Sequence, residues 1–325
     1  MSELHKFIFE GLPVRGALVR LTDAWTEILA RRQANSATGA WPPAVAELLG
    51  EMAAAGVLMQ SNIKFNGALV LQVFGDGPVK VAVAEVQHDL SLRVTAKVLG
   101  DVQLNDRLPE LVNVHNKGRC AITLDPRDKL PGQQPYQGVV PLHGDRGEKL
   151  ERLSDVLQHY MLQSEQLDTT LVLAADAKVA AGLLIQRLPL EGEGNLAGSM
   201  VSKANEDEIG LNEHYNRIAT LAATLQRDEL LELDADTVLR RLFWEERLMR
   251  FPTQVPRFAC TCSRERVANM IRSLGREEAD SIVEEQGGIE VGCDFCGQQY
   301  RFDAVDAAQL FASPGDQPPV TTAVQ

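Results

Sequence analysis

Two short stretches near the C-terminus, Phe258-Ala-Cys-Thr-Cys-Ser-Arg-Glu-Arg266 and Gly292-Cys-Asp-Phe-Cys-Gly297, carry four of the five cysteines in the chain. Each stretch places two thiols one or two residues apart, and thirty residues separate the second thiol from the third. A close pair can present both sulfurs to one ion, and two pairs complete the tetrahedral sulfur shell that Zn²⁺ prefers. No histidine follows His214, so we predict one Zn²⁺ bound by thiolates alone. The predicted ligands are Cys260, Cys262, Cys293 and Cys296.

The spacing of the first pair leaves other interpretations open. One residue separates Cys260 from Cys262, whereas ordinary zinc ribbons have two residues between paired thiols. The four cysteines could instead form two disulfides or be unrelated buried thiols. Disulfide scaffolds are typical of short secreted chains. This chain has 325 residues and no export-type signal, so metal binding is the better interpretation.

The composition is that of an ordinary globular protein, with 45% hydrophobic residues. The N-terminus has no long apolar run or cleavage-type site, and no stretch approaches the roughly 18 apolar residues needed to cross a bilayer. We therefore expect a cytoplasmic protein with no membrane partner. Thiols stay reduced in that compartment, which favours a metal-bound resting state.

The charge balance argues against a nucleic-acid partner. The net charge is -13 and the pI is about 5.0, whereas affinity for phosphates depends on clustered Lys and Arg. From Thr253 onward there are six Arg and no Lys against eleven acidic residues. A zinc module with this balance is not expected to bind DNA or RNA.

Residues 1–189 predict an α+β domain. Apolar residues recur at helical spacing in 17–32 and after Pro42-Pro43, and the period changes to two between Phe65 and Val98. Helices and strands mixed without a regular β-α-β alternation favour an antiparallel sheet with helices against it. Further strands are expected at 119–124, 136–142, 169–174 and 180–188, and a helix at 147–164.

No catalytic set emerges from this domain, so we do not predict an enzyme. Gly75-Asp-Gly77 is turn chemistry, because the glycine fingerprint of a phosphate loop and its following helix are missing. Cys120 lies in a strand pattern and is most simply a small buried hydrophobe. The histidines at positions 88, 115, 143 and 159 are scattered and form no metal-binding pair.

Residues 190–252 predict a linker. Segment 191–208 is rich in Gly, Ser and acidic residues and is expected to be a mobile connection. Segment 209–249 has a helical pattern with an apolar side. So small a helical hairpin cannot offset an ordering cost of about 1–2 kcal/mol per residue, so it must dock on a neighbour. It is either a permanently packed linker or a weakly bound one that exposes an apolar stripe on release.

Residues 253–312 predict a small metal module, and residues 313–325 a disordered tail. Ser263 can cap a helix that ends at Gly275, a second helix ends at Gly287, and Asp303 opens a last helix. A core this small depends on its metal, since structural zinc contributes about 10–16 kcal/mol of folding free energy. Four thiolates leave no open coordination position for catalysis, but they remain oxidisable. Oxidation that removes the ion would therefore unfold the module.

Short motifs along nearly the whole chain carry a resemblance to one family. Beside the cysteine boxes they are Pro13-Val-Arg-Gly16, Lys64-Phe-Asn-Gly67, Gly75-Asp-Gly-Pro78, Tyr136-Gln-Gly-Val-Val140, Ser164-Glu-Gln-Leu167 and Trp244-Glu-Glu246. With these motifs, the chain resembles the redox-regulated molecular chaperones of the heat-shock protein 33 family. The order Cys-x-Cys then Cys-x-x-Cys is the most specific feature.

The resemblance implies a reduced, zinc-bound, inactive form. Oxidants acting with unfolding stress would release zinc and pair Cys260 with Cys262 and Cys293 with Cys296. The linker would then loosen, the protein would form a homodimer, and apolar surface on the linker and N-terminal domain would bind unfolding client proteins without ATP. The acidic run 191–208 is longer than is usual in the family, and Val267 stands where some members have another cysteine.

Two other functions remain as alternatives. A thiol-disulfide oxidoreductase would use Cys293 and Cys296 as a thioredoxin-like pair, but this pair lies in a knuckle-like turn and not at a helix start after a strand. A zinc-ribbon factor that binds nucleic acid is opposed by the charge balance.

Overall fold

The computed structural model describes residues 1–35, 38–128, 134–188 and 206–312. Contacts divide the chain into two compact units, Met1–Ala259 and Cys260–Gln325. Both cysteine pairs belong to the second unit, whereas Cys120 and the linker helices belong to the first. In the described ranges, no helix combines the length and apolarity that crossing a bilayer requires.

The first unit contains a five-stranded antiparallel sheet in the order β10-β1-β2-β9-β8. The central strand β2 and its neighbour β9 are buried along nearly their whole length because both faces of this sheet are covered. The strands are β1 Glu3–Phe9, β2 Val14–Leu21, β8 Thr169–Ala175, β9 Ala180–Arg187 and β10 Leu248–Arg250.

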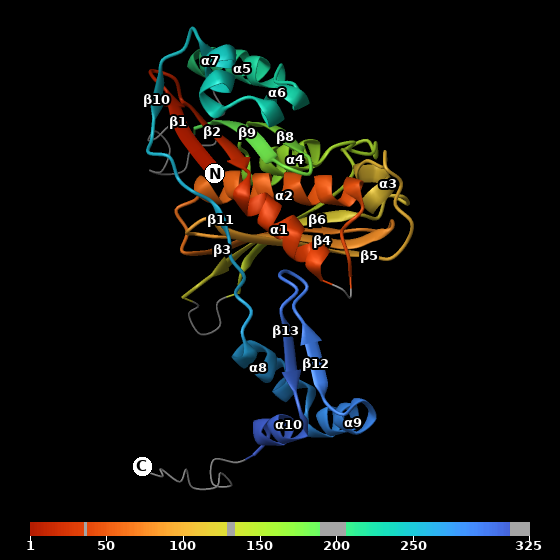
Figure 1. Ribbon diagram of the computed structural model, residues 1–325. Coiled ribbons are helices and arrows are strands. Elements are labelled where there is room, and N and C mark those ends of the chain that lie inside the picture. The colour runs from red at the N-terminus through yellow and green to blue at the C-terminus, as the bar shows by residue number, and fades with distance from the viewer. Residues whose placement is uncertain (36–37, 129–133, 189–205, 313–325) are drawn as a thin grey trace, which may run out of the picture. The chain divides into compact units, whose positions relative to one another are not determined.

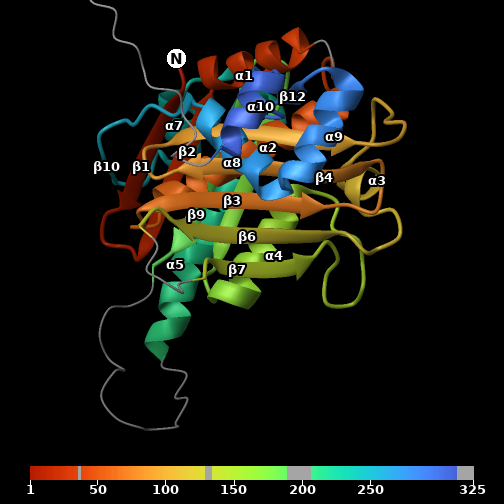
Figure 2. The same cartoon turned by 90° about the horizontal axis from the view of Figure 1, so that it is seen from below.

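A six-stranded sheet in the order β11-β5-β4-β3-β6-β7 forms another layer of the same unit, and Figure 2 shows several of its strands side by side. Its neighbours are antiparallel except β11, which is parallel to β5. Burial alternates along β3 and β4, as expected for strands with one face on a core. The strands are β3 Gly67–Phe74, β4 Val79–Gln87, β5 Ser91–Val98, β6 Arg119–Pro126, β7 Tyr136–Pro141 and β11 Arg257–Phe258.

Helix α2, Pro43–Ser61, lies between the two sheets and contacts strands of both (Figure 1). Pro43 occupies the first helical turn, where its missing N–H costs nothing. Gly50 and Gly56 permit the close approach, because a Cβ would lie 2.4 Å from Ala175 Cβ and 2.9 Å from Val86 Cγ2, respectively. The other helices of this layered core are α1 Asp23–Ala34, α3 Leu108–Val112 and α4 Leu153–Glu165.

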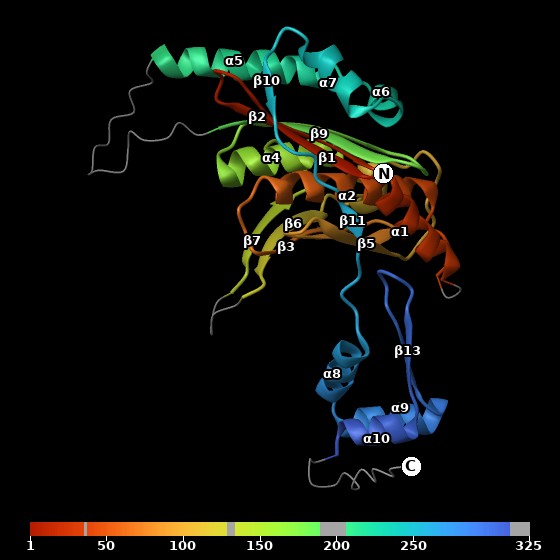
Figure 3. The ribbon, with the colours of Figure 1, turned by 60° about the vertical axis from the view of Figure 1, so that its left-hand side comes forward.

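The linker helices pack on the face of the five-stranded sheet opposite α2 (Figures 1 and 3). They are α5 Glu206–Ala223, α6 Arg227–Glu232 and α7 Ala235–Phe243. Their apolar residues form a core separate from that around α2, together with side chains of β1, β2, β8 and β9. The predicted docking of the helical linker is therefore confirmed.

The second unit has three helices and a hairpin in its described residues: α8 Arg264–Leu274, α9 Arg276–Gln286, β12 Ile289–Gly292, β13 Gln299–Phe302 and α10 Ala304–Leu310. The predicted helix caps are confirmed, because the Ser263 side chain accepts from Arg266 N and that of Asp303 from Val305 N and Asp306 N. The core is small, and its buried members are Val267, Ala268, Ile271, Ala279, Ile289, Phe302 and Ala307.

The α+β fold class is confirmed, and so are the predicted strands between 67 and 188. The predicted helix at 17–32 is wrong in its first part, because Val14–Leu21 is strand β2 and the helix begins at Asp23. The helix predicted at 147–164 begins only at Leu153, and the helical run 209–249 ends in strand β10.

Parts of two predictions lie outside the described residues. These are the mobile connection at 191–208, except for residues 206–208 at the start of α5, and the disordered tail at 313–325. The domain bounds 1–189, 190–252, 253–312 and 313–325 stay a prediction; the contacts themselves divide the chain between Ala259 and Cys260.

Candidate metal centre

The four cysteine sulfurs of the second unit form one cluster. All four Sγ atoms lie within 4.8 Å of one another. Contacts join the two sequence pairs, with Cys260 Sγ 3.6 Å from Cys293 Sγ and Cys262 Sγ 3.4 Å from Cys296 Sγ. In the described ranges no other group of three His, Cys, Asp or Glu side chains is arranged to hold an ion.

Local structure explains how each pair is presented. Cys260 and Cys262 lie in the extended segment before α8, which Ser263 caps. Cys293 and Cys296 lie in the turn between β12 and β13, where Cys293 N donates to Gln298 O at 2.9 Å and Gly297 N donates to Cys293 O at 2.8 Å. Gly297 has a φ of 75°, which a glycine adopts without strain. The turn directs both sulfurs toward the first pair.

The cluster fits a tetrahedral metal. With a Zn–S distance of about 2.3 Å, tetrahedral sulfurs are about 3.8 Å apart. The contacts of 3.4 and 3.6 Å are close to that spacing, and all four cysteines are half-buried. Sulfur-only donors complete the shell, so the site suits a structural ion and leaves no position for a substrate.

Crowding controls the protonation of these thiols. A contact with Cys260 and burial raise the pKa of Cys293 well above its ordinary value, and burial together with contacts to Cys262 and Cys260 raises the pKa of Cys296 to about 11. Four thiolates this close repel one another unless a cation lies among them. A bound divalent ion would reverse the shift, because it favours the deprotonated ligand.

Tyr300 is a member of the site that is not among the residues predicted from the cysteine motifs. Its hydroxyl donates to Cys262 Sγ at 3.1 Å, and this contact raises the pKa of Tyr300 to about 12. The tyrosine shares one face of β13 with Phe302 of the small core, so strand periodicity is the signal that could identify it. Cys120 is not part of the cluster: it is fully buried on β6, and burial raises its pKa to about 12.

Comparison with known proteins identifies the family of this chain. The model of the family described as Hsp33 protein matches residues 2–303. The chain belongs to the Hsp33 family. The 33 kDa chaperonin of Chromobacterium violaceum is 44% identical over 310 residues, which are 95% of this chain and 94% of the relative. That of Neisseria meningitidis serogroup A is 41% identical, covering 94% of this chain and 90% of the relative.

A solved structure supports the fold. The crystal structure of the 33 kDa chaperonin from Thermotoga maritima superposes with a TM-score of 0.70 at 19% identity, covering 95% of this chain and 97% of that one. The resemblance drawn from the sequence motifs is thus confirmed, and this Hsp33 protein belongs to a family of chaperones.

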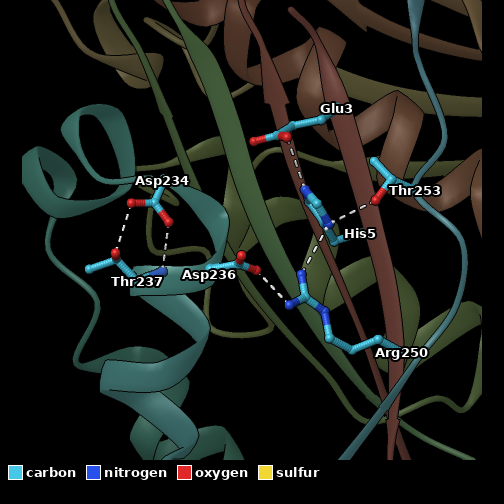
Figure 4. Close-up of polar contacts among 7 residues, drawn as sticks. All are labelled: Glu3, His5, Asp234, Asp236, Thr237, Arg250 and Thr253. Atoms are coloured by element: carbon cyan, nitrogen blue, oxygen red, sulfur yellow. Dashed lines mark hydrogen bonds and ion pairs between the residues drawn. The ribbon is translucent and has the colours of Figure 1, made fainter.

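Polar contacts fix the linker of this Hsp33 protein on its first strand (Figure 4). His5 Nε2 lies 3.1 Å from Glu3 Oε2, and His5 Nδ1 lies 3.2 Å from Arg250 Nη2. Arg250 Nη1 donates to Asp236 Oδ1 of α7 at 2.5 Å. Because an arginine side chain only donates hydrogen bonds, His5 Nδ1 is the acceptor from Arg250. The ring proton of the neutral imidazole is therefore assigned to Nε2. The network joins β1, β10 and α7, which are distant in sequence.

Proposed function

We propose that this protein is a redox-regulated, ATP-independent holdase that binds thermally unfolding or oxidatively damaged proteins and prevents their aggregation. It is inactive while Cys260, Cys262, Cys293 and Cys296 bind one Zn²⁺, and it is activated when oxidation of these ligands releases the ion. The observation that carries the proposal is the apolar interface under α5, α6 and α7, which is covered in this structure.

The covered surface has the chemistry that an unfolding client needs. Phe7 and Phe9 of β1 meet Phe243 of α7 with ring centroids 6.2 and 5.1 Å away, respectively. Around them lie aliphatic side chains of β2 and β9. Release of α7 would expose a contiguous aromatic and aliphatic sheet face, and exposed patches of this kind bind other apolar segments. Both the sheet face and the released helices would then contact clients.

The metal provides the control. The second unit has a small core, and zinc bound to four thiolates contributes about 10–16 kcal/mol of folding free energy. Strands β10 and β11 pair with β1 and β5 and connect α7 to Cys260, so unfolding of the second unit would free the chain that begins directly after β11. We propose that this freed chain weakens the docking of β10 and α7.

The oxidation pairs Cys260 with Cys262 and Cys293 with Cys296. In each pair two thiolates lose two electrons and form one S–S bond; with peroxide, the O–O bond breaks and two protons complete two waters. In the metal-binding arrangement Cys260 Sγ contacts Cys293 Sγ and Cys262 Sγ contacts Cys296 Sγ, so the proposed pairing requires the ion to leave and the two sulfurs of each sequence pair to come into bonding distance. We further propose action in the cytoplasm, where thiols rest reduced, and a homodimer as the active form.

An oxidoreductase that uses Cys293 and Cys296 is the weaker candidate. Such enzymes need a thiol whose pKa is lowered, commonly at a helix N-terminus. Here the pair lies in the turn before β13 and not at the start of a helix. Insulin reduction by the reduced protein would support this candidate, and its absence would remove it.

Light scattering of a thermally aggregating client tests the proposal, with reduced and peroxide-treated protein compared while a chromogenic chelator reports released zinc. We expect suppression by the oxidised form alone and about one zinc released per chain. The Cys120→Ala variant serves as the matched control, because that thiol is outside the cluster. Equal suppression by both forms would refute the redox control, and no suppression by either would refute the holdase.

A further inference from the structure

The first unit contains a cavity that the proposed redox control does not use. It encloses about 120 Å³ between the C-terminal end of α2, the end of α4 and strands of both sheets. Most of its wall is apolar, and two flexible methionines contribute to it. Its apolar lining includes Met59, Leu69, Ile122, Leu124, Met161 and Leu184.

One cation faces this apolar space. Arg15 of β2 lines the cavity, is half-buried, and donates to neutral acceptors, with its Nε 3.0 Å from Gln186 Oε1 and Nη1 3.3 Å from Asn62 O. A second cation, Lys6, lies nearby: burial, and secondly the charge of Arg15, lower the pKa of Lys6. In the described part of the chain, no carboxylate lies within ion-pair distance of either cation. Within the described residues Arg15 is therefore held by amide and carbonyl oxygens and has no carboxylate partner.

The carboxylate on the same wall is already occupied. Glu165 Oε1 accepts from Tyr160 Oη at 2.7 Å and from Tyr136 Oη at 3.0 Å. Gly138 leaves room for the Tyr160 ring, because a Cβ there would lie 2.6 Å from it. The two tyrosines thus hold Glu165 through its hydrogen bonds, and Arg15 remains the charged group free to meet an anion.

Three motifs that carry the family resemblance meet at this cavity. Arg15 belongs to Pro13-Val-Arg-Gly16, Tyr136 begins Tyr136-Gln-Gly-Val-Val140, and Glu165 belongs to Ser164-Glu-Gln-Leu167. They are far apart in sequence, and no cysteine of the cluster is among the lining residues. Three separate stretches of the chain thus supply the polar groups of one cavity.

We propose that this cavity binds a small organic carboxylate, with its apolar body among the methionine and leucine side chains and its carboxylate on Arg15. A guanidinium is suited to this role because its planar fork pairs with both carboxylate oxygens. The volume limits the apolar body to one ring or a short alkyl chain, since a cavity of about 150 Å³ accommodates benzene. The proposal does not depend on the redox control.

Methionine-methyl NMR of the full-length protein tests the site, with octanoate as the probe and 1-octanol as its uncharged counterpart. We expect octanoate to shift the Met59 and Met161 methyl signals saturably. The exposed Met249 and Met270 are internal controls and should not move. Absence of a shift at Met59 and Met161, or equal shifts at all four methionines, would overturn the proposal.

Two variants separate the charge from the cavity. Arg15→Gln should weaken octanoate binding about 10- to 100-fold, the range of charge-assisted hydrogen bonds, and leave octanol binding within about twofold. Leu124→Phe should fill the cavity and abolish binding of both probes, which keeps the test decisive if Arg15→Gln does not fold. Arg187→Gln is the matched control, because Arg187 pairs with Asp168 at 2.7 Å and does not line the cavity. Equal octanoate binding by Arg15→Gln and the parent protein would refute a carboxylate site and leave an apolar pocket.

Discussion

Arg20 Nη1 donates to the backbone carbonyl oxygen of Leu230 at 2.5 Å, which joins the middle of the five-stranded sheet to the C-terminal end of linker helix α6. The same guanidinium donates through Nη2 to Leu231 O at 3.0 Å. These carbonyls are among those that a helix end leaves without intrahelical partners, and a cation is favourable there. One side chain of the five-stranded sheet thus forms two hydrogen bonds with the docked linker.

Replacement of Arg20 by Gln is expected to loosen the linker without touching the cysteines. Loss of two charged hydrogen bonds should cost about 1–3 kcal/mol of docking free energy and raise the population of released linker about 10- to 100-fold. Hydrogen exchange in α6 and α7 should accelerate, and the reduced protein should suppress client aggregation in part. Arg152→Gln, which removes an exposed pair with Asp155, is the control. Unchanged exchange in α6 would contradict the role given to Arg20.

Replacing two adjacent aromatic residues of the linker by alanine should have very different effects on linker docking. Phe243 is 2% exposed and packs on Phe7 and Phe9, whereas Trp244 is 74% exposed. Phe243→Ala should cost about 3–5 kcal/mol of packing free energy, so the reduced protein should bind a fluorescent apolar dye. Trp244→Ala should stay within about 0.5 kcal/mol of the parent protein. Equal dye binding by the two variants would contradict the docking interface.

The features that the sequence predicted correctly are local ones. The caps Ser263 and Asp303 act over a few residues, so the order of the residues is enough to place them. Strand β2 was mistaken for helix because both of its faces are buried, which removes the alternation that marks a strand.

Contacts between distant segments could not be predicted in the same way. The hydrogen bond from Arg20 to Leu230 spans 210 residues, and nothing in either local pattern identifies the partner. Likewise Leu248–Arg250 is a strand because it pairs with β1, whereas the local spacing of apolar residues predicts a helix. The hydroxyl of Tyr300 reaches Cys262 only because the β12–β13 hairpin returns the chain to the first thiol pair.

Glu51 of α2 should make stability depend on pH. Burial, and secondly the charge of Glu47, raise the pKa of Glu51 to about 8 from an ordinary value of 4.5. The folded protein retains this proton between those values, so unfolding releases it and the free energy of unfolding falls as pH rises from about 4.5 to 8. Glu51→Gln should be about 1–3 kcal/mol more stable than the parent protein at pH 9 and similar at pH 4.

Urea unfolding followed by far-ultraviolet circular dichroism at pH 4, 7 and 9 measures this dependence. Glu27→Gln is a suitable control, because Glu27 forms an exposed pair with Arg31. If the free energies of unfolding of Glu51→Gln and the parent protein change in parallel with pH, the Glu51 carboxyl is not the source of the pH dependence.

Tyr300 is expected to stabilise the metal-bound cluster from outside the ligand shell. Its hydroxyl donates to Cys262 Sγ at 3.1 Å, and such outer contacts typically account for about 10- to 100-fold in metal affinity because they orient the ligand and stabilise its thiolate charge. Tyr300→Phe should therefore lose zinc at about tenfold lower chelator concentration, measured by competition with a chromogenic chelator, and should reach full client suppression at a lower peroxide dose. Arg301→Gln is the control, since that exposed neighbour contacts Glu290 at 3.6 Å and not the sulfurs. Identical zinc affinities for Tyr300→Phe and Arg301→Gln would show that the hydroxyl does not support the cluster.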